Sequence, residues 1–309
     1  MKISVLTPTY NRGKLLEQLY NSLKNNSIYG IDIEWLIMDD GSTDNTYEVI
    51  QKYIIELEEE NNNKLEIKYF KQENQGKMAA INNLVEKATG TYIIECDSDD
   101  YFTKDSFKII KSEIERNDKI LDNENIYGLC FLKYDQNGKN MGQDFKVSKT
   151  TMFDLYFKQG ETGEKAIVFK ADIRKKYKHK IEKNERFVTE ARMYHEIDKL
   201  YNLICINNPI MICEYQNEGY TKNMKKQFLE NPKGYYMYFK EILELDMNGV
   251  KFNKRLYVIK HYILFEYLIS KLKETESLEK NNKIRGMFNK ILYLFLRTVG
   301  RIKARKYTN

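Results

Sequence analysis

Three carboxylates lie within four residues of the sequence, at Asp97, Asp99 and Asp100, directly after the largely apolar run 92–96. Like charges this close repel one another, and at the end of a buried strand they would also lose hydration. A divalent cation relieves this repulsion, because Mg²⁺ and Mn²⁺ take oxygen ligands and often share them with substrate phosphates. The cluster therefore predicts a metal site. The alternative is an acidic turn that caps the next helix.

Strand-like and helical segments alternate along the first hundred residues. The expected strands are 3–7, 34–38, 65–70 and 92–96, and the expected helices between them are 14–25, 44–60 and 77–88. Strands that alternate with helices of this length indicate βαβ units and a mainly parallel sheet. Ligands of such sheets bind at the carboxyl ends of the strands.

Polar residues stand at or just beyond the end of each expected strand. The four groups are 7–12, 39–44, 74–77 and 97–100. Because the carboxyl ends of parallel strands meet at one edge of the sheet, we expect all four groups to converge there. The first group contains no GxGxxG, and no GxxxxGK[ST] occurs in the chain. A bound nucleotide is therefore expected to be held by side chains and a metal, without a glycine-rich cradle.

The segments 5–12, 39–44, 74–77 and 97–100, taken in this order and spacing, resemble the inverting family-two glycosyltransferases of the GT-A fold. The resemblance is strong to about residue 105 and weaker to about residue 215. It implies an α/β fold, with a Rossmann-like, mainly parallel mixed sheet flanked by helices and a C-terminal helical extension. The implied domains are a nucleotide-sugar-binding and catalytic domain over 1–217 and a helical region over 218–309, associated with an acceptor or a membrane.

The resemblance also implies how the donor is bound. The second aspartate of the DDGS-type motif, Asp40, would recognise the nucleotide base, since a carboxylate can accept the imide N–H of uracil. Pro8, Tyr10 and Arg12 would line the base and ribose, and Lys77 would approach the diphosphate. For Asp40, Arg12 and Lys77 the alternatives are a turn-shaping role or an exposed charge.

Asp97 and Asp99 match the family's DXD motif. The resemblance makes Asp99 a direct ligand of Mn²⁺ or Mg²⁺ and puts Asp97 on the ribose or the metal, with the cation bridging the two phosphates of the donor. An inverting reaction also needs a general base. Residues 185–190 resemble the family's E-x-F-[IV]-x-E segment, whose last acidic residue, Glu190, would be that base. Glu185, then Glu164 and His195, are the alternatives.

The function implied is metal-dependent, inverting transfer of a sugar from a nucleoside-diphosphate sugar, with UDP as the expected nucleotide. The acceptor would be a glycan or a lipid-linked molecule in surface polysaccharide synthesis. A nucleotidyltransferase is a rival class, but it would need a basic glycine-rich loop after the first strand. A non-catalytic nucleotide-sugar-binding module is the second rival, and the intact acidic cluster argues against it.

The 309-residue chain is 42% hydrophobic and carries a net charge of +6. Outside residues 281–309 it is close to neutral, which argues against a nucleic-acid partner. Four scattered cysteines without metal-ligand spacing are typical of a reducing compartment. Met1 leads directly into a strand, so no secretory signal is expected. The sequence contains no run of about 18 apolar residues, so no membrane-spanning helix is expected. We therefore expect a cytoplasmic protein.

Residues 281–309 carry eight Lys or Arg and no Asp or Glu, interleaved with large apolar residues at helical spacing. A basic amphipathic helix of this kind suits an anionic membrane surface, which would make the protein peripheral on the inner face of the plasma membrane. Packing of this helix on the domain is the alternative, and contact with a second copy in a homodimer is a third interpretation.

Overall fold

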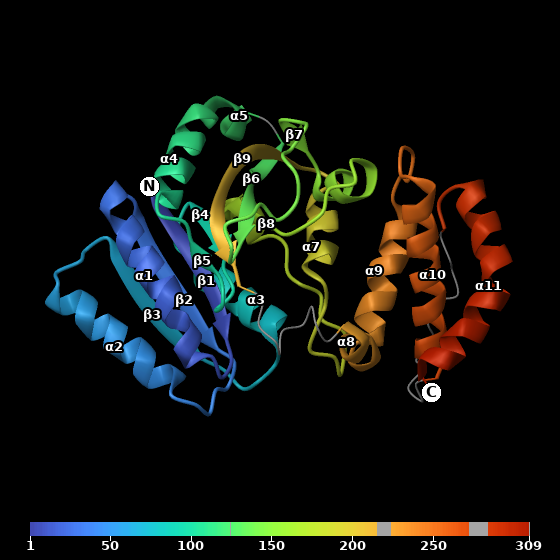
Figure 1. Ribbon diagram of the computed structural model, residues 1–309, viewed down its shortest axis with the longest axis horizontal. Coiled ribbons are helices and arrows are strands. Elements are labelled where there is room, and N and C mark those ends of the chain that lie inside the picture. The colour runs from blue at the N-terminus through green and yellow to red at the C-terminus, as the bar shows by residue number, and fades with distance from the viewer. Residues whose placement is uncertain (124, 215–223, 272–283, 309) are drawn as a thin grey trace.

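The computed structural model describes residues 1–123, 125–214, 224–271 and 284–308. The nine strands of this part form one sheet in the order β3-β2-β1-β4-β8-β6-β9-β5, with β7 paired to β9. Helices cover both faces of the sheet, and further helices form a separate layer beyond it (Figure 1). The predicted α/β fold with a C-terminal helical extension is confirmed.

The first four strands along the chain pair in parallel and carry the predicted motifs at their ends. They are β1 (Lys2–Thr9), β2 (Asp32–Asp39), β3 (Leu65–Lys71) and β4 (Tyr92–Glu95). β1 is buried from Ile3 to Thr9 without alternation, because helices cover both of its faces.

The helices lie in two groups, one on each face of this sheet. On one face are α1 (Leu16–Asn26), α2 (Thr46–Glu59) and α4 (Ser106–Arg116), whose apolar residues share a core with β1 and β2. On the other face are α3 (Lys77–Lys87), α6 (Ala171–Arg174) and α7 (Glu190–Ile197). Short turns of 3₁₀ helix flank α1 at Gly13–Leu15 and Ser27–Tyr29.

The second half of the sheet is mixed. Its strands are β5 (Tyr101–Phe102), β6 (Ile126–Asp135), β7 (Lys149–Thr150), β8 (Lys165–Lys170) and β9 (Asn202–Cys213). β8 is antiparallel to both β4 and β6, whereas β6 and β9 are parallel. A short helix, α5 (Asp118–Asn123), precedes β6, and a π-helical turn spans Asp154–Lys158.

The sequence predicts two strands, 203–206 and 210–215, around Asn207-Asn208-Pro209, and this is wrong. One strand, β9, runs through the whole segment to Cys213, with shifts in its register against β6 near Pro209. The Asn207 side chain accepts the Phe145 N–H at 2.7 Å and donates to the Phe145 carbonyl at 3.1 Å. Proline is tolerated at such an irregularity, so the chain bulges there and does not turn. Residue 215 lies outside the described part.

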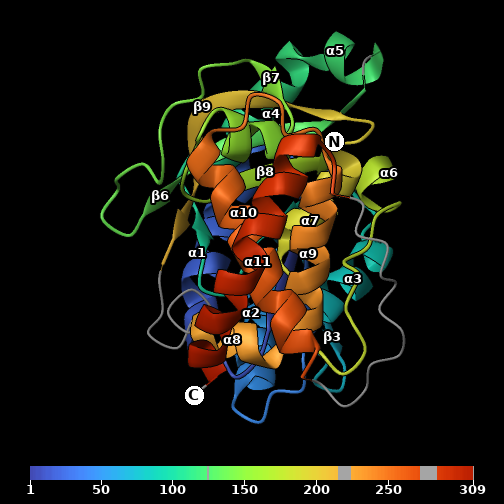
Figure 2. The same cartoon turned by 90° about the vertical axis from the view of Figure 1, so that its right-hand side faces the viewer.

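In the described part of the chain, four helices follow the sheet domain and lie on the far side of α7 (Figures 1 and 2). They are α8 (Met224–Glu230), α9 (Pro232–Glu244), α10 (Phe252–Ile269) and α11 (Met287–Thr308). They share a core of their own, centred on the aromatic rings of α9 and α10. The predicted domain boundary at 217/218 lies outside the described residues. No helix in the described part is long and apolar enough to cross a bilayer.

His195 lies where the sheet domain meets these helices. Its ring stacks on Tyr238 of α9, with the centroids 5.7 Å apart, and meets Phe153 and Phe157 edge-on. The side chain is only 6% exposed. Burial lowers the pKa of His195 to about 3, so the ring is neutral in the folded protein. This environment makes His195 part of the packing between the two layers.

The buried neutral ring predicts a specific loss of stability in acid. The unfolded chain takes up a proton at His195 as the pH falls below about 6.5, whereas the folded protein does not. This residue should therefore cost about 2 kcal/mol of the free energy of unfolding between about pH 7.5 and pH 5. His195→Gln should lose correspondingly less over the same range, as measured by urea unfolding at both pH values. Equal losses would show that His195 titrates normally in the folded state.

Candidate active site

Side-chain hydrogen bonds hold the loops after β1 and β2 together at one edge of the sheet. The Asn11 N–H donates to Ser42 Oγ at 2.9 Å, and Asn11 Oδ1 accepts the Thr43 N–H at 2.8 Å. The Gly13 N–H donates to Asp44 Oδ2 at 3.2 Å. These contacts join the first two groups of polar residues expected to converge.

Asp40 fastens the loop after β3 to the same edge. Its Oδ1 accepts the Gln72 side-chain amide and the Gln75 N–H, each at 2.8 Å, and its Oδ2 accepts the Gly76 N–H at 2.8 Å. The carboxylate is buried. It therefore shapes the turn whether or not it also contacts a nucleotide base. With three donors in place, one acceptor position is left on Oδ2 for a ligand.

Asp39 is buried beside it and organises the preceding turn. It accepts the Ser42 N–H at 2.6 Å and the Tyr69 hydroxyl at 2.7 Å. The two aspartates thus connect the ends of β2 and β3, and the base-binding role of Asp40 stays a prediction.

Lys77, the first residue of α3, bridges two carboxylates that are distant in the sequence. Its Nζ lies 2.7 Å from Asp97 Oδ2 and 3.0 Å from Glu190 Oε1. Burial alone would lower the pKa of Lys77, but the two carboxylates outweigh it and raise the pKa well above its ordinary value. Burial likewise opposes ionisation of Asp97, yet the adjacent ammonium lowers its pKa. Lys77 and Asp97 are therefore both charged at neutral pH.

Arg12 pairs with the second carboxylate of the cluster. Its Nη1 lies 2.8 Å from Asp99 Oδ2 and donates to Ser98 Oγ at 3.4 Å. Burial raises the pKa of Asp99 to about 6, although Arg12 opposes the shift. This contact joins the loop after β1 to the loop after β4.

Lys133 pairs with the third carboxylate and was not predicted from the sequence. From β6 its Nζ reaches Asp100 Oδ2 at 2.8 Å and Glu164 Oε2 at 3.4 Å. Burial would lower the pKa of Lys133, but these carboxylates raise it well above its ordinary value. The sequence did contain a signal for it, because Lys133 directly follows the largely apolar run 126–132. The strand is buried from Ile126 to Lys133. A lysine there requires a buried partner.

Basic side chains of the protein thus offset the repulsion among the three aspartates. Asp97 and Asp99 nevertheless fit Mg²⁺ or Mn²⁺, because they are hard oxygen donors with side chains 40% and 14% exposed. Two carboxylates suffice where a diphosphate supplies further oxygens. Within the described residues, the ligand atoms of Asp100, Glu164 and Cys213 also lie within 4.8 Å of one another. The Lys133 ammonium lies against the first two, so this group already holds a cation of its own.

The segment that carries Glu190 packs directly against the loop after β3. Gly76 has a φ of +94°, and a Cβ built there would lie 2.2 Å from the Arg186 carbonyl oxygen. The Arg186 guanidinium donates to Asn74 Oδ1 at 3.1 Å. Glu190 then begins α7, where the helix dipole favours a carboxylate. This close approach puts Glu190 within reach of Lys77.

The C-terminal helices hold the same segment from the other side. The Glu185 carboxylate accepts the N–H groups of Lys233 and Gly234, in the first turn of α9, at 2.6 and 2.7 Å. The buried Asn231 side chain accepts the N–H groups of Arg186 and Phe187, each at 3.0 Å. Glu185, an alternative base in the sequence, therefore caps a helix. Burial raises its pKa to about 7.

The structure thus brings Arg12, Lys77, Asp97, Asp99 and Glu190 together. Pro8 is buried in β1, and Tyr10 is 48% exposed at the end of the same strand. The other alternative bases lie elsewhere: Glu164 contacts Lys133, and His195 is in the interface with α9.

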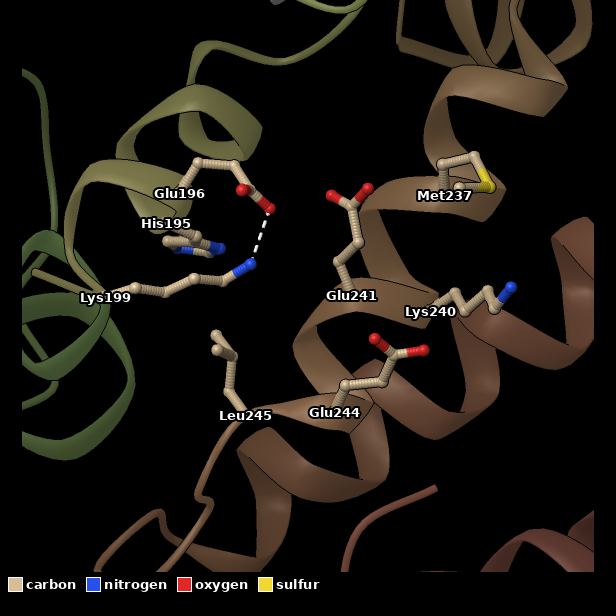
Figure 3. A pocket seen from close by; sticks show the side chains of 8 residues that line it. All are labelled: His195, Glu196, Lys199, Met237, Lys240, Glu241, Glu244 and Leu245. Carbon is tan, nitrogen blue, oxygen red and sulfur yellow. Dashed lines mark hydrogen bonds and ion pairs between the residues drawn. The ribbon is translucent and has the colours of Figure 1, made fainter. Parts of the chain in front are cut away.

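A cavity of about 350 Å³ lies between the C-terminal halves of α7 and α9 (Figure 3). Glu196 and Lys199 face it as an ion pair at 2.7 Å, and Glu241 is bound by Arg192. The lining residues are His195, Glu196, Lys199, Met237, Lys240, Glu241, Glu244 and Leu245. Of the residues named for the site from the sequence, only the alternative base His195 is among those that line this cavity, so the cavity is separate from the acidic edge of the sheet.

Comparison with known proteins gives a consistent result. The family model described as Glycosyl transferase family 2 matches residues 4–163, just over half of the chain. An uncharacterized glycosyltransferase of Mycoplasma genitalium is 36% identical over 139 residues, 43% of this chain and 44% of its own. A GalNAc(5)-diNAcBac-PP-undecaprenol beta-1,3-glucosyltransferase of Campylobacter jejuni is 28% identical over 180 residues, 56% of this chain and 52% of its own. The chain spans about half the length of these two relatives.

Two solved structures share the fold. One is S. aureus TarS 1–349 in complex with UDP-GlcNAc, with a TM-score of 0.55 at 17% identity, covering 98% of this chain and 81% of that one. The other is a mannosyltransferase from Pyrobaculum calidifontis in complex with GDP-Man and Mn²⁺, with a TM-score of 0.50 at 15% identity, covering 97% and 86%. At these identities the likeness concerns the fold.

The close approach at Gly76 predicts that a methyl group there disrupts the site. Gly76→Ala should strain a left-handed residue and also push the Arg186 carbonyl away. Gly138→Ala is the matched control, because Gly138 has a φ of +75° with nothing within 4 Å of a built Cβ. We expect Gly76→Ala to cost about 1–3 kcal/mol more than the control in urea unfolding. Equal costs would mean that the 185–190 segment does not rest on this loop.

Proposed function

The chain belongs to glycosyl transferase family 2, and from this premise we propose that it transfers a sugar from a nucleoside-diphosphate sugar to a hydroxyl group of a glycan or lipid-linked acceptor. The observation that carries the proposal is the ionic cluster at the edge of the sheet. In this cluster Arg12 pairs with Asp99, and Lys77 pairs with both Asp97 and Glu190. Surface polysaccharide synthesis is the setting we propose, and the named activity of the Campylobacter relative supports it.

UDP is the nucleotide we propose for the donor. The S. aureus TarS structure with this fold is a complex with UDP-GlcNAc, which supports the choice. In our proposal Asp40 accepts the imide N–H of the uracil ring through the acceptor position left on Oδ2. Pro8, Tyr10 and Arg12 line the base and ribose at the end of β1.

The carboxylates of Asp99 and Asp97 would hold a divalent cation, Mn²⁺ or Mg²⁺, and the mannosyltransferase complex with Mn²⁺ supports this choice. When bound, such a cation offsets the negative charge that develops on the departing nucleoside diphosphate. Arg12 and Lys77 now pair with the same carboxylates. In our proposal both basic side chains turn to the donor phosphates when the carboxylates bind the metal.

Glu190 is the general base in this proposal. Its carboxylate takes the proton of the acceptor hydroxyl while that oxygen forms a bond to the anomeric carbon of the donor. The bond from this carbon to the phosphate oxygen breaks on the opposite side, so the configuration of the anomeric carbon inverts. The electron pair of that bond leaves with the nucleoside diphosphate.

Lys77 links donor binding to the base. Without a donor its ammonium group contacts both Asp97 and Glu190 Oε1. A diphosphate is a stronger anionic partner than one carboxylate, and it would draw the ammonium group away from Glu190. The base would then be free to accept a proton only when the donor is in place.

The first experiment is a thermal-shift screen of UDP-, GDP- and TDP-sugars with Mn²⁺, followed by measurement of nucleoside diphosphate release. Asp99→Asn removes the charge of a proposed metal ligand while keeping its shape. We expect turnover to fall by at least about a hundredfold and Mn²⁺-dependent UDP binding, measured by calorimetry, to be lost. Asp118→Asn, at an exposed aspartate in α5, is the matched control and should behave as the wild type.

If the Asp99→Asn variant retained turnover, Asp99 would not be a ligand of the metal. Binding of a UDP-sugar without release of nucleoside diphosphate, with every acceptor tried, would favour the non-catalytic binding module.

Glu190→Gln tests the base separately from the donor site. The amide cannot take a proton, so transfer should fall by about 100-fold to 10,000-fold while UDP-sugar affinity stays within a few-fold of the wild type. Glu196→Gln is the matched control, because Glu196 lies on the same helix and pairs with Lys199 near its end. Transfer and UDP-sugar affinity are measured for both variants. If Glu190→Gln retains turnover, the proton is taken by another group.

A further inference from the structure

Helix α11 has one face that packs on the protein. Asn289 and Tyr293 are buried, and Leu292 and Leu296 are partly buried in the core of the C-terminal helices. The Tyr293 hydroxyl donates to Glu266 of α10 at 2.7 Å. Figure 2 looks onto the outer side of this layer, where α11 lies in front of α10. The inner face therefore accounts for the place of α11 in the fold.

The opposite face of α11 is also apolar, and it is exposed. We call its five large residues the outer stripe: Met287, Phe288, Ile291, Leu294 and Phe295. Each of these side chains is between 52% and 77% exposed. At 100° per residue they fall within about 120° of the helix circumference, and the centre of this sector is turned away from the inner face. Among the described residues, the packing of the domain leaves most of this surface exposed.

The outer stripe continues onto the neighbouring helix. Phe252, at the start of α10, is 56% exposed, and its ring centroid lies 6.2 Å from that of Phe288. Exposed apolar residues scattered singly over a protein are ordinary, whereas a contiguous apolar patch indicates an interaction surface.

Two exposed basic residues adjoin the stripe. Lys290 is exposed within the helix, and Arg285 is exposed just before it. The last turns of α11 add Arg301, Lys303, Arg305 and Lys306 in the sequence, and residues 281–309 contain no acidic residue. The partner of this surface must therefore be apolar in its interior and negatively charged at its boundary.

We propose that the outer stripe of α11 docks the protein on the surface of a bilayer that contains anionic lipids. Helix α11 would lie in the plane of the interface, with the five apolar side chains among the upper acyl chains and the basic residues at the headgroups. This mode fits a chain in which no described helix can cross the membrane. A second copy is a poorer partner, since it would bring two clusters of like charge together.

Docking in this way leaves the acidic edge of the sheet accessible. Helices α9 and α10 separate α11 from the sheet domain (Figure 1). The inference goes beyond the proposed function and does not depend on it, because it rests on the exposed surface of the C-terminal helices.

The test is flotation of the full chain with vesicles of phosphatidylcholine, alone or with about 30% phosphatidylglycerol. The wild type should bind the anionic vesicles at least about tenfold more tightly than the neutral ones, and high salt should weaken this binding. The double variant Ile291→Ser/Phe295→Ser should bind at least about tenfold more weakly than the wild type. Leu200→Ser, at a residue 62% exposed beyond the end of α7, is the matched control and should bind as the wild type does.

Thermal unfolding checks that the double variant is folded, which we expect because both side chains are exposed. Unchanged binding of a folded double variant, or no binding by the wild type, would overturn the proposal. A wild-type dimer in sedimentation that the double variant loses, with no vesicle binding by either, would identify a second copy as the partner and would equally overturn it. Donor binding, measured in parallel by calorimetry, reports separately on the proposed function.

Discussion

The ammonium group of Lys77 joins the two carboxylates on which the proposed chemistry depends. Asp97 belongs to the loop after β4 and Glu190 to the first turn of α7, and a single Nζ atom reaches both. Without it, two partly buried carboxylates would face each other unpaired, which typically costs several kcal/mol. The position of α7 relative to the sheet is therefore set in part by charge. The ion pairs of Arg12 and Lys133 extend the same arrangement, so that each aspartate of the cluster has a basic partner from another element.

The C-terminal helices belong to this site although none of the predicted residues lies on them. Glu185 and Asn231 tie the chain before Glu190 to the start of α9, and Gly76 lets the same chain rest on the loop after β3. The proposed base, Glu190, is thus carried by a segment held between two layers. A loop attached to the sheet alone would leave its distance from Asp97 less well defined, and proton transfer needs that geometry to be accurate.

The fold and the convergence of the loops after the first four strands could be predicted from the sequence, because those signals are local. Apolar runs buried on both faces, amphipathic helices and polar groups at strand ends can each be recognised within about ten residues. What determines the rest is contact between distant segments: the partners of each carboxylate, the Gly76–Arg186 approach and the helix-capping role of Glu185. The single strand through Pro209 was missed for the same reason, since an Asn207 contact with Phe145 stabilises the bulge. Lys133 was detectable in principle as a lysine at the end of a buried apolar run.

Substitutions on the two apolar faces of α11 should have different consequences. A change at Tyr293 alters the internal packing and lowers the stability of the fold, whatever the function of the protein. A change at Phe295 meets only the surroundings of the molecule. In our proposal, such a change alters whether the protein binds the membrane surface and leaves its fold and chemistry intact. One helix can therefore evolve along two independent routes, and homologues could move between membrane and bulk solution through a few outward positions while retaining the same core.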